Sequence, residues 1–164
     1  MNKYLPGNYP GGRNKPTGQA VGAANRASGF NTNDSALILA IIAKESGFSP
    51  TPTQDHGPMQ LTAWVKNYLN KHAPDLIVAG SFDPFGRKSA ASRNRTFTGD
   101  YDANVQTGAN WIQYQRNNLG MSDYQVAYGW GPGPTWAIRD AYAKDALSLR
   151  DMYAPFLNCL KTGQ

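Results

Sequence analysis

Cysteine and histidine are scarce in this 164-residue chain, which has one cysteine, Cys159, and two histidines, His56 and His72. A single thiol excludes an intramolecular disulfide and argues against the small, disulfide-stapled class of secreted protein. We expect Cys159 to be a small apolar residue of the core. Two isolated histidines without cysteine partners do not make a zinc ligand set. The sequence implies no metal and no cofactor.

Long apolar runs are also missing. No stretch approaches the roughly 20 residues that a membrane span needs, and the first seven residues have no apolar core of a signal peptide. We therefore expect no membrane insertion and no export signal in this chain. Internal repeats and low-complexity segments are absent as well.

Charged residues make up only 16% of the chain, whereas 40% is hydrophobic, a balance typical of a globular domain whose surface is largely uncharged. The length suits one domain. Lysine and arginine number 16 against 11 aspartates and glutamates, a net charge of +5. This excess favours anionic partners such as nucleic acid, acidic membranes or bacterial envelopes.

The chain divides into an N-terminal arm and a helical domain. Residues 1–32 are rich in glycine, proline and asparagine, so we expect an irregular arm, with at most a short helix over 19–26, packed on or flanking the domain of residues 33–164. Within that domain, residues 36–46 predict the strongest helix, capped by Asn33, Asp34 or Ser35 and ended by Gly47. Its residues are apolar nearly all round, which predicts a buried central helix.

The remaining elements are mostly helical. Residues 49–61 carry turn residues and predict a loop or short hairpin lobe, after which Thr62 caps a helix over 63–69 that stops before Pro74. Residues 75–101 predict a long surface excursion and candidate binding flap. Further helices are expected from Asp102 to Arg116, from Ser122 to Tyr128, over 135–143, and over 144–153 with an interruption near Pro155. The fold class is therefore mainly α with one small non-helical lobe.

Glu45 is the most informative acid. At helical spacing its neighbours are Ile41 and Ile42, with Leu37 and Ile38 one turn earlier, so its carboxyl ends an apolar helix face. Desolvation and the helix C-terminus both disfavour the carboxylate. A glycosidase needs such a protonated acid. A solvated glutamate at a helix end is the alternative that spacing alone does not exclude.

Four segments in order resemble the motifs of the soluble lytic transglycosylase and goose-type lysozyme superfamily. They are Ala43–Phe48 (AKESGF), Gly57–Thr62 (GPMQLT), Asn104–Val105 with Gly108, and Ala127–Gly133 (AYGWGPG). Each motif alone is weak, but four in the right order are fairly specific. The resemblance covers about residues 34–142. It implies a lysozyme-like α+β domain that cleaves the β-1,4 bonds of bacterial peptidoglycan.

Carried over by position, the resemblance makes Glu45 the catalytic acid and Ser46, its usual follower in the family, a substrate-binding residue. It places Met59 and Gln60, with Thr62 beside them, in the wall of the glycan cleft, and it makes Tyr128 the tyrosine that hydrogen-bonds near the catalytic carboxyl. Met59 also suits a core position. The family's pattern has leucine where Pro58 stands and Asn-Ala where Gly129-Trp130 stands. Trp130 is then a sugar-stacking platform or a core residue.

The resemblance leaves two outcomes open. A lytic transglycosylase uses one carboxyl as acid and then as base and leaves a 1,6-anhydro end, whereas an inverting lysozyme needs a second carboxylate to activate water. Asp55 is the candidate for that base, although Asp-His-Gly is also ordinary turn chemistry. Family members often carry a serine in the segment that joins the first motif to the second. Gln54 and Asp55 are the nearest candidates for its position here.

Several rivals remain at this point. The fold of the family is also compatible with cleavage of chitin, or with a non-catalytic module that binds cell-wall glycan. The basic residues Arg87, Lys88, Arg93 and Arg95 suggest a nucleic-acid binder, but no nucleic-acid motif accompanies them. Residues 100–111 start like a calcium loop but lack its glycine and final glutamate.

We expect a monomer whose partners are peptidoglycan strands and the anionic cell envelope, with no nucleic acid. Its place of action is then the cell wall, the periplasm or the exterior. With no signal in the chain, release by lysis, delivery by a phage particle or removal of a signal would bring it there.

Overall fold

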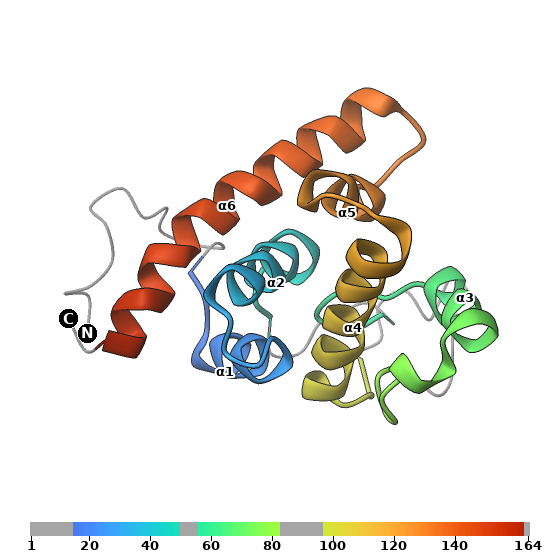
Figure 1. Ribbon diagram of the computed structural model, residues 1–164, viewed down its shortest axis with the longest axis horizontal. Coiled ribbons are helices and arrows are strands. Elements are labelled where there is room, and N and C mark those ends of the chain that lie inside the picture. Colours follow the sequence, from blue (N-terminus) through green and yellow to red (C-terminus); the bar gives the residue numbers. More distant parts are fainter. Residues whose placement is uncertain (1–14, 50–55, 83–96, 163–164) are drawn as a thin grey trace.

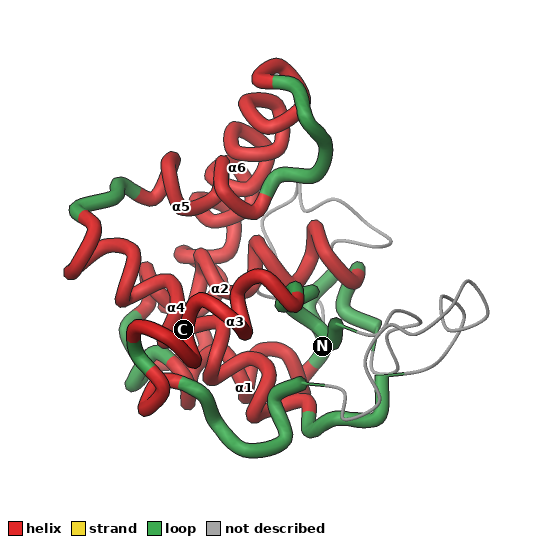
Figure 2. The backbone as a smooth tube through the Cα atoms, turned by 90° about the vertical axis from the view of Figure 1, so that its right-hand side faces the viewer, coloured by secondary structure: helices red, strands yellow, loops and turns green. Residues whose placement is uncertain are grey.

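A computed structural model describes residues 15–49, 56–82 and 97–162 of the chain. Within these ranges the secondary structure is helical, with six α-helices, one 3-10 turn and no strand (Figure 2). The prediction of a mainly α fold is confirmed. No helix in the described ranges has the length and apolarity that crossing a membrane requires.

Helix α2 (Thr32–Ser46) is the centre of the core. Every residue from Ser35 to Ala43 is buried, as its all-round apolar sequence predicts. The helix begins earlier than expected, because Asn31 and not a residue of 33–35 is the cap: its side chain accepts a hydrogen bond from the Asp34 amide at 3.1 Å. Gly47 ends the helix in the left-handed conformation, φ 59°, as predicted.

Helix α1 (Gly18–Ala27) packs against α2 and against α4 (Tyr101–Leu119). The short helix expected near 19–26 is therefore present, and its Ala20, Ala23 and Ala24 belong to the same core as α2. Small side chains let the helices approach closely. Residues 1–14 of the expected arm lie outside the described ranges.

Helix α6 (Trp136–Thr162) is one continuous helix that crosses α2 along its length (Figure 1). The prediction of two helices with an interruption near Pro155 is wrong. Pro155 lies on the exposed side of α6, while Tyr153 and Leu157 on the opposite side are buried against the core. Water can therefore solvate the carbonyl that proline leaves without a partner, and the packed face holds the helix together.

The other elements are α3 (Ala63–His72), which Thr62 caps, the 3-10 turn η1 (Pro74–Leu76), and α5 (Asp123–Trp130), which Ser122 opens with a capping box. Of these, η1 contacts α3 and α4, and α5 packs against α6 and also contacts α2 and α4. The surface excursion expected over residues 75–101 therefore begins within η1. Residues 83–96 lie outside the described ranges, and with them the basic group Arg87, Lys88, Arg93 and Arg95. Of the expected non-helical lobe, residues 56–60 form a turn, and 50–55 are not described. Cys159 is half-buried and not a full core residue.

Candidate active site

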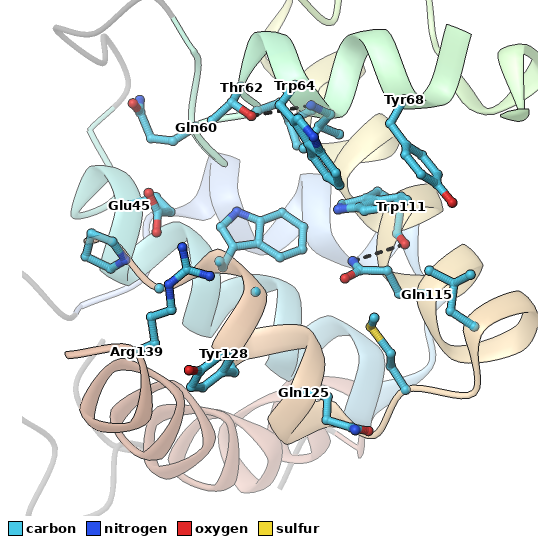
Figure 3. Close-up of a pocket in the computed structure, with 18 of the residues that line it drawn as sticks. Glu45, Gln60, Thr62, Trp64, Tyr68, Trp111, Gln115, Gln125, Tyr128 and Arg139 are labelled. Atoms are coloured by element: carbon cyan, nitrogen blue, oxygen red, sulfur yellow. Dashed lines mark hydrogen bonds between the residues drawn. The ribbon is translucent and has the colours of Figure 1, made fainter. Parts of the chain in front are cut away.

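A cavity of about 1040 Å³ opens beside the C-terminal end of α2. Its lining comes from α2, the turn before α3, α3, α4, α5 and the start of α6, as Figure 3 shows in close-up. The volume is at the upper end of the range for small-molecule sites. Glu45 is the only carboxylate among the described residues that line it.

The Glu45 carboxyl is held at one side of the cavity by Tyr142. The Tyr142 hydroxyl, on α6, donates a hydrogen bond of 2.5 Å to Glu45 Oε1. Burial raises the pKa of Glu45 from 4.5 to about 7, although the hydrogen bond from Tyr142 and the charge of Lys44 lower it in part. The same burial and the Glu45 charge raise the pKa of Tyr142 well above its usual range, so the tyrosine stays a donor. A half-protonated carboxyl with a fixed orientation results near neutral pH.

Lys44 is the cation next to this pair. Its ammonium forms a 3.0 Å ion pair with Asp145 and lies 5.3 Å from the centre of the Tyr142 ring. Asp145 is largely exposed. Because Asp145 binds Lys44 on the solvent side, the lysine is kept near Glu45 without pairing with it, which leaves the Glu45 proton available.

The raised pKa of Glu45 predicts a pH dependence of stability. A carboxyl whose pKa is higher in the folded than in the unfolded protein costs stability as pH rises through 4.5, and the cost is complete above about 7. Relative to Glu45→Gln, the wild type should therefore lose about 2–3 kcal/mol of unfolding free energy between pH 4 and pH 8. Urea unfolding of both proteins at several pH values measures this. A difference that is independent of pH would show that the carboxyl is solvated.

Asn104 braces the turn that forms one edge of the cavity. Its side chain is fully buried, accepts from the Met59 amide at 3.0 Å, and donates to the carbonyls of His56 at 3.1 Å and Ser81 at 2.8 Å. Gly57 allows this approach, because a Cβ there would lie 2.6 Å from the Asn104 side chain. One buried amide thus sets the position of the 56–60 turn beside Glu45.

Aromatic side chains form the wall opposite Glu45 (Figure 3). Trp64 and Tyr68 of α3 stack with ring centres 5.4 Å apart, and Trp111 of α4 meets both rings at 6.2 and 5.3 Å. Trp64 is 63% exposed, so one face of its indole is available to a ligand. Flat apolar faces next to side-chain amides suit the faces and hydroxyls of sugar rings.

Some of the predicted site residues line the cavity, and two lie outside the described residues. Gln60, Thr62, Tyr128 and Trp130 line the cavity with Glu45. Trp130 is at the same time fixed to the protein, since its indole N–H donates to the Met59 carbonyl at 3.0 Å. Gln54 and Asp55 lie outside the described ranges.

Three predicted roles need correction. The Met59 side chain is fully buried and packs against Gly108 of α4, where a Cβ would lie 2.3 Å from its sulfur, so it fills the core and does not line the cleft. The Ser46 hydroxyl donates to the Ile42 carbonyl of its own helix and does not line the cavity. The tyrosine that hydrogen-bonds Glu45 is Tyr142 and not Tyr128.

Sequence reasoning missed Tyr142, the aromatic wall and Arg139. Tyr142 is on α6, and no local sequence pattern indicates that this helix packs against α2. Trp64 and Tyr68 are four residues apart on a predicted helix, and that spacing was the available signal for a shared face.

No protein-family model matches the chain, and no curated protein matches it.

Proposed function

We propose that this protein cleaves the β-1,4 glycan strands of bacterial peptidoglycan, with Glu45 as the catalytic acid. The single observation that carries the proposal is a carboxyl with a pKa of about 7 at the side of a large, aromatic-walled cavity. The four ordered motifs that resemble the lytic transglycosylase and goose-type lysozyme superfamily support it. On this proposal the fold is lysozyme-like.

The first half of the reaction uses the Glu45 proton. Glu45 transfers it to the glycosidic oxygen, the bond between that oxygen and C1 of N-acetylmuramic acid breaks, and the departing N-acetylglucosamine leaves with a free hydroxyl. Positive charge develops on the muramic acid ring. Tyr142 meanwhile stabilises the new Glu45 carboxylate through its hydrogen bond.

The second half regenerates the acid. The C6 hydroxyl of the same muramic acid attacks C1, and its proton passes to the Glu45 carboxylate, which closes a 1,6-anhydro ring. No water and no second carboxylate enter this sequence. Glu45 is the only acid among the described residues that line the cavity, and this supports transglycosylation over hydrolysis. Hydrolysis would instead need Asp55 as the base that activates water.

Release of soluble fragments from purified peptidoglycan sacculi tests the proposal. We expect the wild type to release them, with a rate that falls as pH rises above about 7, because Glu45 then loses its proton. Asp55→Asn should release them at a rate within about threefold of the wild type. A loss of 100-fold or more in Asp55→Asn would instead assign the hydrolytic mechanism, and no release by the wild type would refute glycan cleavage.

A further inference from the structure

Arg139 brings a permanent positive charge into the cavity. Among the lining residues that the structure describes, it is the only lysine or arginine. No ion pair joins its guanidinium to a carboxylate of residues 15–49, 56–82 or 97–162, whereas Arg26, Arg116 and Arg150 all have such partners. Figure 3 shows its side chain extending from α6 into the cavity. Within the described part of the chain, its charge is thus left for a ligand.

The guanidinium is held in place by the protein. Its Nε donates to the Gly133 carbonyl at 2.9 Å, and its central carbon lies 5.9 Å from the centre of the Tyr128 ring. Gly131 allows the close packing of this loop on α6, since a Cβ there would lie 3.0 Å from the Arg139 Cα. Nε is already used, and no hydrogen bond joins the two terminal nitrogens to another described residue, so their donors can serve a ligand. A fixed guanidinium binds a planar carboxylate with little loss of side-chain entropy.

We propose that Arg139 recognises a carboxylate of the substrate and thereby selects anionic glycan strands over neutral ones. This inference rests on the proposed glycan cleavage. Chitin, the neutral β-1,4 polymer of N-acetylglucosamine, has no carboxylate. Peptidoglycan has two sources of a carboxylate: the stem peptide in intact strands, and the lactyl group of muramic acid once that peptide has been removed. Both present the same acceptor to the guanidinium.

The test compares kcat/KM of the wild type and Arg139→Gln on four substrates. Two are anionic: intact peptidoglycan strands and strands freed of their peptides. Two are neutral: strands whose carboxyl groups have been converted to amides, and chitin oligomers. On at least one anionic substrate we expect Arg139→Gln to lower kcat/KM about 10- to 100-fold. A loss on intact strands assigns the stem peptide, and a loss on peptide-free strands assigns the lactyl group. On the neutral substrates the two proteins should agree within about twofold, which also controls for folding.

Two variants separate recognition from net charge and from structure. Arg139→Lys keeps the charge but not the planar pair of donors, so it should restore only part of the activity on the anionic strands. Lys71→Gln removes one positive charge at an exposed position of α3 that does not line the cavity, and it should leave all four rates unchanged. Equal losses in Arg139→Gln on anionic and neutral strands, or no loss on either, would overturn carboxylate recognition while glycan cleavage stands. A wild type that cleaves none of the four would refute the proposed function itself.

Discussion

Glu45→Gln should lower the rate of peptidoglycan cleavage by about 1000-fold or more while the protein stays folded. The amide has nearly the shape of the carboxylic acid, and its oxygen still accepts the hydrogen bond from Tyr142, so the site is preserved. It has no proton to give to the glycosidic oxygen and accepts none from the attacking hydroxyl. Because one group serves both steps, its removal should lower the rate by more than the removal of a single acid or base usually does. Release of soluble fragments from sacculi measures the effect.

The matched control for this variant is Asp75→Asn. It makes the same chemical change at an exposed carboxylate of η1 that does not line the cavity. We expect Asp75→Asn to cleave at the wild-type rate and Glu45→Gln to sediment with sacculi as the wild type does. If Glu45→Gln kept its lytic activity, the protein would use another acid.

Asn104→Ala should destabilise the protein by about 3 kcal/mol or more. The change leaves the Met59 amide and the carbonyls of His56 and Ser81 without their side-chain partner, and each buried unpaired group costs roughly 1–3 kcal/mol. Cleavage should fall about tenfold even where the variant is folded, because His56 and Gln60 line the cavity from the turn that Asn104 holds. Urea unfolding and cleavage of sacculi at low temperature measure the two effects.

Asn67→Ala provides the control for Asn104→Ala. Asn67 is exposed on α3, and the same substitution there should change the unfolding free energy by less than about 0.5 kcal/mol. A comparably small change in Asn104→Ala would mean that the 56–60 turn is held by other contacts.

The central helix could be predicted from the sequence because its signals are local. Residues 36–43 are apolar on every face, and Gly47 supplies a left-handed ending that few other residues adopt. Thr62 and Ser122 were predictable as caps for the same reason, since a cap acts within three residues of its own position. The position of Glu45 at the end of this apolar helix followed directly.

The partners of Glu45 were not predictable in this way. Tyr142 is 97 residues further along the chain, and only the crossing of α6 over α2 brings its hydroxyl to the carboxyl. Pro155 misled the helix prediction because the local rule ignores which side of the helix faces water. Met59 illustrates the same limit: its residue type suits a cleft wall and a core equally well, and the close approach of Gly108 decides for the core.

The chemical nature of the products tests the central claim most directly. Mass spectrometry of the muropeptides that the wild type releases from purified sacculi distinguishes a 1,6-anhydro end from a reducing end, because the anhydro product is lighter by one water. If Glu45 acts alone as acid and then as base, the new muramic acid ends will be 1,6-anhydro ends. Reducing ends would contradict that account, since they require a water and a second group to activate it.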